Sequence, residues 1–319
     1  MKRPKLNIIV PCYNEEAVLP TSAAKLSQIL LDLISHKIVS AQSLICFVND
    51  GSQDNTLPIL KKLTKQSQHI AYLSLSRNFG HQSALLAGLF ETTADIYITI
   101  DADLQDDPQK IFDMIQKYKE GNDIVYGVRT SRDTDTWFKK KTARFFYLLQ
   151  KWMGIKAVYN AADFRLMSQR AVNALRSFHE RNLFLRGIVP LLGFPSAQVF
   201  YPRTARTAGE TKYPFVKMCS FALNGIIGFS VVPIRLLTIV GMCISLLGMI
   251  LLMWSLYQYA TGNNVQGWAS LFSAMTFFNG IIIFSLGVIG EYIGKIFIEV
   301  KNRPLFIVDQ KVGLRQEKI

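Results

Sequence analysis

The chain is poor in cysteine and lacks the short motifs that mark several common protein classes. Four cysteines occur in 319 residues and none forms a CxxC pair, so they indicate neither a zinc site nor a disulfide framework. We therefore expect a reducing compartment. No GxxxxGK[ST] sequence is present, which excludes a P-loop, and no GxGxxG follows the first apolar run, which argues against a dinucleotide site. The basic amino terminus precedes only about five apolar residues, too few for a signal peptide.

Charged residues are missing from a long stretch near the carboxyl terminus. Between Leu236 and Gly290 there is no Asp, Glu, Lys or Arg. Two apolar blocks, about 236–259 and 268–290, are joined there by the polar sequence TGNNVQG. At 1.5 Å per residue each block reaches roughly 33–36 Å, enough to cross a hydrocarbon core of about 30 Å. Two buried core helices are the alternative, but two such blocks in tandem favour a transmembrane hairpin over 236–293.

The charges that flank the predicted hairpin indicate its orientation. Basic residues precede the first block and follow the second, whereas the connecting loop has no Lys or Arg. By the positive-inside rule, both ends of the hairpin then lie in the cytoplasm. We predict a multi-pass protein of the cell membrane with both termini cytoplasmic, an interfacial helix over 213–235 and a cytoplasmic tail over 294–319.

The formal net charge of +13 suggests an anionic partner. The candidates are a nucleic acid, an anionic membrane surface and a phosphorylated substrate. Part of this charge lies in the stretch 135–154, which mixes aromatic residues with lysines and arginines. That composition is typical of an amphipathic helix on anionic lipid. A core helix with a solvated basic face is the alternative.

Residues 1–212 alternate short apolar runs with helical patterns, which is typical of an α/β domain with a mostly parallel sheet. The expected strands contain LNIIV, LICFV, IAYLSL, IYITI and DIVYGV. Helices are expected over Glu15–Leu33, Asn55–Gln66, His81–Thr92 and Pro108–Glu120. Asn14 is the expected cap of the first helix, and Asp106 or Asp107 of the last. Ligands of such sheets bind at the carboxyl ends of the strands.

Four of the expected strands end in a polar cluster, in the order PCYNEE, NDGSQDNT, SRNFGHQSA and DADLQDD. One polar strand end is ordinarily a turn, but four on one edge of a parallel sheet predict a binding site. In the fourth cluster, Asp101, Asp103 and Gln105 are spaced two residues apart, so their oxygens can turn towards one point. Such ligands suit Mg²⁺ or Mn²⁺, with a substrate phosphate completing the shell. We expect His81 to make a structural or substrate hydrogen bond rather than to act in acid–base catalysis.

Together these residues resemble glycosyltransferase family 2, whose catalytic domain has the Rossmann-like GT-A fold. The motifs that carry the resemblance are IIVPCYNEE, VNDGSQDNT, SRNFGHQSALLAG and DADLQDDP. The match is best to the membrane-anchored polyprenyl-phosphate glycosyltransferases, a group that includes bactoprenol glucosyltransferases and dolichol-phosphate mannose synthases. The later pieces ADFRLMSQRAV, ERNLFLRG and YPRTARTAGETKY also fit, as does the carboxyl-terminal apolar pair. The resemblance covers nearly the whole chain.

The resemblance implies a role for single residues of this chain. Those expected to bind the nucleotide sugar are Pro11, Tyr13, Asn14, Glu15, Asp50, Ser52 and Asp101. Those expected at the metal are Asp101, Asp103 and Gln105. The lipid phosphate is expected to meet Arg129, Arg203, Arg206 and Lys212. The expected catalytic residues are Asp103, Asp163 and Arg203, with Asp163 near the reacting carbon.

The predicted reaction is a metal-dependent, inverting transfer of a sugar from a nucleoside-diphosphate sugar to polyprenyl phosphate, at the cytoplasmic face of a bacterial inner membrane. The acceptor is a phosphate monoester with a second pKa of about 6, so it is largely an anion at neutral pH and needs little help from a base. Asp163 is therefore expected to act through electrostatics or positioning. UDP-glucose is the first choice of donor and UDP-N-acetylglucosamine the second. The resemblance also admits a homo-oligomer.

Three other functions fit the sequence less well. A processive polysaccharide synthase would carry a QxxRW element, which is missing, and usually more membrane spans. A basic membrane protein that binds nucleic acid would not need the DxDxQ series or basic residues next to the bilayer, so we expect no nucleic acid partner. A non-catalytic scaffold would not need Asp101, Asp103 and Gln105 intact.

Overall fold

The structure is a computed structural model that describes residues 3–130, 158, 160–181, 184–202, 232–261 and 267–314. Contacts divide the chain into two compact units. The first comprises residues 1–151, 156–213 and 303–319, and the second comprises 152–155 and 214–302. The described part of the first unit is α/β and that of the second is helical.

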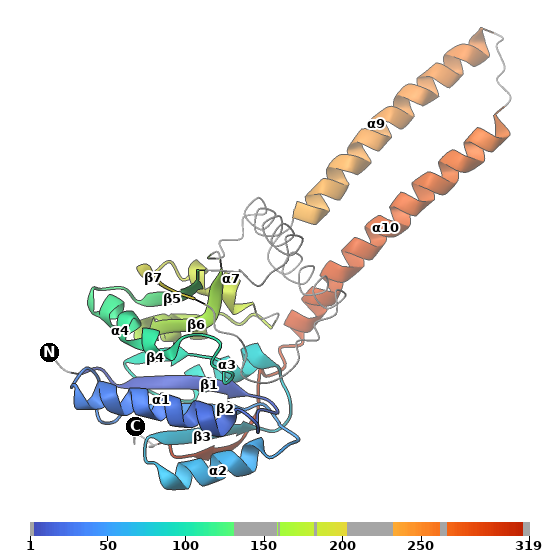
Figure 1. Cartoon of the computed structure of the whole chain (residues 1–319). Coiled ribbons are helices and arrows are strands. Elements are labelled where there is room, and N and C mark those ends of the chain that lie inside the picture. The colour runs from blue at the N-terminus through green and yellow to red at the C-terminus, as the bar shows by residue number, and fades with distance from the viewer. Residues whose placement is uncertain are drawn as a thin grey trace. The chain divides into compact units, whose positions relative to one another are not determined.

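The described residues of the first unit form an eight-stranded, mostly parallel sheet with the strand order β7-β5-β6-β4-β1-β2-β3-β8 (Figure 1). β6 runs antiparallel to β4 and β5, and β8 runs antiparallel to β3. The predicted α/β class with a mostly parallel sheet is therefore confirmed. The strands are β1 (Leu6–Cys12), β2 (Leu44–Asn49), β3 (Ile70–Leu75), β4 (Ile96–Thr99), β5 (Ile124–Arg129), β6 (Ala161–Ser168), β7 (Ser196–Tyr201) and β8 (Val308–Val312).

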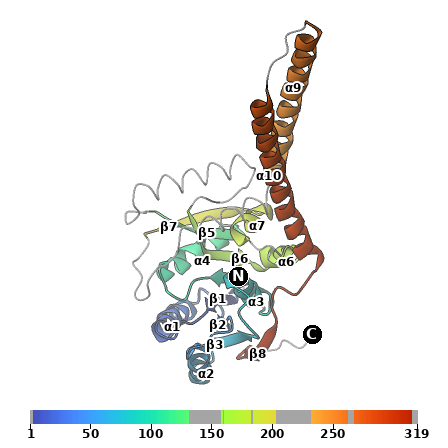
Figure 2. The ribbon, with the colours of Figure 1, turned by 90° about the vertical axis from the view of Figure 1, so that its right-hand side faces the viewer.

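Helices cover both faces of this sheet, which explains why its central strands are buried along their whole length and mostly apolar. Helices α1, α2 and α4 lie on one face, and α3 and α6 lie on the other (Figure 2). Side chains alternate between the faces, so Ile8 and Val10 join the core under α1, whereas Ile9 meets α3 at Gly88. The helices are α1 (Leu19–Ser35), α2 (Thr56–Gln66), α3 (His81–Phe90), the 3₁₀ turn η1 (Pro108–Lys110), α4 (Ile111–Lys119), α6 (Gln169–Arg176) and α7 (Leu185–Leu191).

Two helix starts differ from the sequence prediction. Helix α1 begins at Leu19 with Val18 as its cap and no capping side chain. Asn14 instead has a φ of 55° and accepts a hydrogen bond on Oδ1 from the amide of Gln53 at 2.8 Å, so it belongs to a loop contact. At the last predicted helix, Asp107 caps η1 through the Gln109 amide, and Asp106 is not a cap.

Within the segment 294–319, which was expected to be a cytoplasmic tail, the first residues belong to α10 and strand β8 joins the sheet of the first unit. β8 pairs with β3, and the Tyr72 hydroxyl donates to Gln310 Oε1 at 3.2 Å. Lys311 also forms an ion pair with Glu91. The prediction missed this strand because a five-residue run rich in polar residues gives no periodic signal, and its partner lies far away in the sequence.

The second unit contains two long helices, α9 (Val232–Ala260) and α10 (Trp268–Val300), in agreement with the predicted pair of apolar helices. Within the described residues, the segment Phe277–Val300 is long and apolar enough to cross a membrane, and α9 contains the shorter apolar segment Leu237–Leu251. Helix α10 extends past the predicted end at residue 290. The predicted interfacial helix over 135–154 and residues 213–231 of the other lie outside the described residues.

Candidate active site at the carboxyl ends of the strands

The loops that follow β1 and β2 are bound to each other by reciprocal hydrogen bonds. The amide of Asn14 donates to Ser52 Oγ at 3.0 Å, while Asn14 Oδ1 accepts from the amide of Gln53. The amide of Glu15 donates to the Thr56 hydroxyl at 2.9 Å. The expected nucleotide residues of these two loops therefore lie together. Pro11 is buried in β1, whereas the Tyr13 side chain is 44% exposed and accessible to a ligand.

Asp50 fixes the loop between β3 and α3. It is buried, and its two carboxylate oxygens accept hydrogen bonds from the amides of Phe79 and Gly80 at 2.7 and 2.9 Å. Burial raises the pKa of Asp50 above its ordinary value, although these amides oppose the rise. Both oxygens that were expected to meet a base or ribose thus already bind backbone amides.

The acidic loop that follows β4 contains Asp101, Asp103 and Gln105. The strand ends at Thr99, so these residues lie in a turn in which Leu104 has a φ of 47°. Asp103 Oδ1 accepts from the amide of Gln105 at 3.2 Å, and the Gln105 side chain is buried. Asp101 Oδ1 is buried without a hydrogen-bond partner. Burial raises the pKa of Asp101 to about 6; His81 opposes the rise, whereas the carboxylates of Asp163, Asp106 and Asp103 add to it.

This loop fits a divalent cation, because the buried Asp101 Oδ1 accepts no hydrogen bond within the described part of the chain and the carboxylates of Asp103, Asp106 and Asp163 lie near it, with His81 Nε2 as a cationic contact at 3.5 Å. Among the described residues, no three His, Cys, Asp or Glu side chains converge on a single metal position. A cation at Asp103 would therefore need further ligands from Gln105 and from a substrate, as Mg²⁺ sites with phosphate ligands do.

Asp163 on β6 is surrounded by cationic side chains. Its Oδ1 lies 2.5 Å from Arg165 Nη2 and 3.3 Å from Arg186 Nε. Its Oδ2 lies 3.0 Å from Arg186 Nη2 and 3.7 Å from His81 Nε2. Burial would raise the pKa of Asp163, but the contacts with His81, Arg186 and Arg165 outweigh it and hold the pKa well below its ordinary value. This carboxylate is therefore ionised and poorly suited to accept a proton.

His81, at the first position of α3, links Asp163 to the acidic loop. Its Nε2 is 3.5 Å from Asp101 Oδ1 in addition to the contact with Asp163. Burial lowers the pKa of His81, but the two carboxylates outweigh burial and raise it above the ordinary value. The expected structural role of this histidine is therefore supported by its position between two carboxylates.

Asp106 forms a cluster with Arg129 and Tyr201, which differs from the helix cap considered for Asp106. Asp106 Oδ1 accepts from Arg129 Nε at 2.7 Å and from the Tyr201 hydroxyl at 2.8 Å. Burial lowers the pKa of Arg129, but Asp106 outweighs burial and raises it. Arg129 was expected at the lipid phosphate; in the structure it binds Asp106 and joins the ends of β5 and β7 to the acidic loop.

The remaining expected phosphate ligands, Arg203, Arg206 and Lys212, lie outside the described residues. The sequence analysis missed Arg165 and Arg186, although both lie in motifs that carried the family resemblance. A signal for Arg165 was present, because Asp163 and Arg165 are two residues apart on one strand and so share a face. Arg186 gave no local signal, because its partner belongs to another element.

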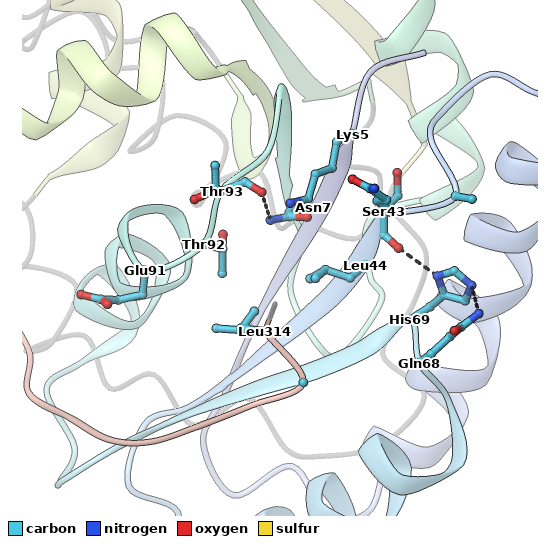
Figure 3. A pocket seen from close by; sticks show the side chains of 13 residues that line it. Lys5, Asn7, Ser43, Leu44, Gln68, His69, Glu91, Thr92, Thr93 and Leu314 are labelled. Atoms are coloured by element: carbon cyan, nitrogen blue, oxygen red, sulfur yellow. Dashed lines mark hydrogen bonds between the residues drawn. The ribbon is translucent and has the colours of Figure 1, made fainter. Parts of the chain in front are cut away.

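A small polar cavity lies at the opposite, amino-terminal ends of the strands (Figure 3). It has a volume of about 70 Å³, and Asn7, Ser43 and Leu314 are among its lining residues. His69 Nδ1 lies 3.0 Å from the Ser43 carbonyl oxygen, and Asn7 Nδ2 donates to the Thr93 carbonyl at 3.4 Å. Asn7 and Ser43 stand at the starts of β1 and β2, so the cavity is separate from the candidate active site.

Comparison with known proteins gives matches along most of the chain. Residues 7–176 match Glycosyl transferase family 2, and residues 232–296 match the GtrB C-terminal hairpin. The Uncharacterized glycosyltransferase YkoT of Bacillus subtilis is 48% identical over 96% of this chain and 92% of its own length. The Prophage bactoprenol glucosyl transferase homolog of Escherichia coli is 38% identical over 95% of this chain and 98% of its own.

Among solved structures, mannosyl-3-phosphoglycerate synthase from Rubrobacter xylanophilus is a distant likeness, with a TM-score of 0.48 and 14% identity over 69% of this chain and 71% of that one. The sequence matches are the decisive ones, because they are both close and nearly complete. The chain therefore belongs to glycosyltransferase family 2.

Proposed function

We propose that the protein transfers a sugar, glucose from UDP-glucose as the first choice, to polyprenyl phosphate at the cytoplasmic face of the cell membrane. The observation that carries this proposal is the acidic loop, in which Asp101 and Asp103 lie two residues apart and the buried Asp101 Oδ1 accepts no hydrogen bond from the described residues but has an ion-pair contact to His81 at 3.5 Å. It is supported by the relative named as a bactoprenol glucosyl transferase homolog, which is 38% identical over 95% of the chain. UDP-N-acetylglucosamine is the alternative donor.

A divalent cation, Mg²⁺ or Mn²⁺, would be held by Asp103 and Gln105, with Asp101 on the nucleotide side. When bound, it would stabilise the charge that grows on the departing diphosphate, which is worth several kcal/mol in comparable sites. The loops after β1 and β2 would bind the nucleotide, with the exposed Tyr13 ring beside it. Asp50 would contribute by fixing the β3–α3 loop.

The acceptor would attack without a protein base. A phosphate monoester has a second pKa of about 6 and is largely an anion at neutral pH. Asp163 is already ionised and bound by two arginines, so its role would be to position them. A single in-line displacement inverts the anomeric carbon, because no covalent glycosyl-enzyme is formed.

The position of β8 supports a hairpin that crosses the membrane twice. β8 follows α10 in the chain, yet it pairs with β3, which precedes α9. Two strands of one sheet lie on the same side of a membrane, so the chain between them crosses an even number of times. If α10 spans the bilayer, as its segment Phe277–Val300 permits, then α9 would span it as well. The basic flanks would put the sheet in the cytoplasm.

The direct test is transfer of labelled sugar to lipid. Membranes containing the protein would be incubated with undecaprenyl phosphate, Mn²⁺ or Mg²⁺, and radiolabelled UDP-glucose, UDP-N-acetylglucosamine or GDP-mannose. We expect one labelled, chloroform-soluble product, which chelation of the metal abolishes. Asp103→Ala should remove it, whereas Asp113→Ala, at an exposed carboxylate that pairs with Lys110, should leave it unchanged. Failure of every donor to label lipid with either metal would refute the proposed function.

A further inference from the structure

Arg186 is the second arginine that contacts the carboxylate of Asp163, whose charge Arg165 already balances. Arg165 is 2% exposed, and its Nη2 lies 2.5 Å from Asp163 Oδ1. A carboxylate carries one negative charge, so this buried contact is enough to balance Asp163. The additional contact of Arg186, at 3.0 and 3.3 Å, can therefore be broken without leaving Asp163 without a cation.

The backbone that carries Arg186 is fixed at the site. The Leu185 amide donates to the side-chain oxygen of Gln82, and the Leu185 carbonyl accepts from Arg165 Nη1, both at 3.3 Å. Leu185, the first residue of α7, is itself buried. The start of α7 is therefore attached both to α3 and to β6, and the Arg186 side chain is anchored one residue further on.

The Arg186 side chain is more exposed than those of the neighbouring arginines. Its side chain is 39% exposed, against 2% for Arg165 and 22% for Arg129. It shares Asp163 with His81, whose Nε2 lies 3.5 Å from Asp101 Oδ1 in the acidic loop. A partly exposed arginine thus lies two contacts away from the loop that would hold the metal and the diphosphate.

We infer that Arg186 is a catalytic residue that exchanges its contact with Asp163 for phosphate oxygens of a substrate. The inference rests on the proposed function. The planar guanidinium matches a carboxylate and a phosphate with the same pair of N–H groups, so a single fork can serve both partners. In the transfer, an acceptor phosphate oxygen forms a bond to the anomeric carbon. The bond from that carbon to the diphosphate breaks, and its electron pair leaves with the diphosphate. Arg186 changes no covalent bond and stabilises phosphate charge.

Two phosphorylated molecules take part in this reaction, the departing nucleoside diphosphate and the acceptor monoester. Binding measurements show which of them Arg186 contacts. The variants are Arg186→Gln and Arg186→Lys in the purified full-length protein. The matched control is Arg170→Gln on α6, whose side chain binds Asp123 and stacks on Phe194. We expect Arg186→Gln to lower kcat by about 10–100-fold, the factor that one charge-assisted hydrogen bond supplies. Arg186→Lys should recover part of the rate, and Arg170→Gln should keep all of it.

Two affinities, for UDP and for undecaprenyl phosphate, show whether Arg186 contacts the departing diphosphate or the acceptor phosphate. Weaker binding of UDP with Mn²⁺, at unchanged affinity for uridine, assigns Arg186 to the departing diphosphate. A raised KM for undecaprenyl phosphate, at unchanged UDP affinity, assigns it to the acceptor. Unchanged kcat and both affinities in Arg186→Gln overturn the inference. The inference is also overturned if Arg186→Lys loses as much rate as Arg186→Gln and the lost rate matches the fraction of protein that thermal unfolding shows to be unfolded.

The result also separates this inference from the proposed function. A wild-type protein that binds UDP but labels no lipid would refute the proposed reaction. In that case UDP affinity alone decides the role of Arg186, since weaker binding in Arg186→Gln supports a diphosphate contact and equal binding overturns it.

Discussion

Asp163 keeps its charge in the interior because cationic groups on three different elements face it. Arg165 comes from the same strand, Arg186 from α7 and His81 from α3. A buried carboxylate without such partners would be neutralised by a raised pKa, since burial disfavours the charged form. At this site the contacts reverse that shift. Asp163 therefore holds the cationic side chains around it in place. This role agrees with an acceptor phosphate that needs no base to remove a proton.

Replacing Asp163 changes how stability depends on pH. The folded-state pKa of Asp163 lies below its unfolded value, so its contribution to the free energy of unfolding is complete above pH 4 or so and is lost as the pH falls further. At pH 7, Asp163→Asn should lower the free energy of unfolding by about 3–5 kcal/mol, because Arg165 remains buried without a counter-charge. Thermal unfolding in detergent at pH 7 and pH 3 measures both effects. The variant should lose less stability on acidification than the wild type, and parallel losses would contradict the assignment.

At the residue scale, the sequence predicted which side chains lie at the site better than it predicted which residues contact each other. Asp101, Asp103 and Asp163 were predicted at the site, and the structure brings Asp101 and Asp163 to the same histidine. The Asp106 cluster was not predictable, because Arg129 lies 23 residues away and Tyr201 lies 95 residues away along the chain. The sequence left Asp106 and Asp107 as alternative caps, and the structure shows that Asp107, the residue directly before Pro108, is the cap.

Among the elements, the loops after β2 and β3 depend on a close approach of two backbones. Gly51 has a φ of 67°, and a Cβ there would lie 2.4 Å from the Arg77 carbonyl carbon. Asp50, the residue before it, binds the amides of Phe79 and Gly80 in the same neighbouring loop. A side chain at position 51 would therefore push apart the two loops that Asp50 holds together.

Gly51→Ala should weaken both folding and nucleotide binding. Gly121→Ala is a matched control, because Gly121 also has a positive φ, of 99°, but a Cβ added there would have nothing within 4 Å of it. Both variants should lose the roughly 1–2 kcal/mol that an alanine costs in a left-handed conformation. Only Gly51→Ala should bind UDP with Mn²⁺ more weakly, as measured by calorimetry. Equal UDP affinities in the two variants would contradict the role given to this loop contact.

The elements themselves were predicted where a periodic apolar pattern exists. The predicted strands and helices of the first 130 residues all occur, and the error at α1 arose because Asn14 is drawn into the loop contact with Gln53. β6 and β7 were not predicted, although pieces of both lay in the motifs that carried the resemblance. Neither run has a continuous apolar pattern, because β6 carries the buried pair Asp163 and Arg165, and the polar Ser196 and Gln198 of β7 are exposed.

For the whole molecule, the absence of charge between residues 236 and 290 was enough to predict the helical pair, but not the return of the chain to the sheet. That return depends on contacts such as Lys311 with Glu91, which are 220 residues apart in the chain. The pairing of β8 with β3 constrains the membrane topology in a way that hydropathy does not. Two paired strands must lie on the same side of a membrane, so the chain between them must cross it an even number of times.

The topology predicts opposite accessibility for two positions in intact cells. A cysteine introduced at residue 263, in TGNNVQG, should react with a membrane-impermeant maleimide, because the proposed topology puts the loop between the two spans outside the cell. A cysteine introduced at residue 318 should react only after the cells are permeabilised. Labelling of both positions in intact cells, or of neither, would contradict a hairpin with both ends in the cytoplasm.

The proposed reaction depends on a divalent cation that joins the acidic loop to the diphosphate of the donor. Anomalous diffraction from crystals of the full-length protein grown with UDP and Mn²⁺ tests this most directly. The account predicts a manganese peak in contact with both Asp103 and the diphosphate oxygens. Bound UDP with no manganese at Asp103 would contradict it.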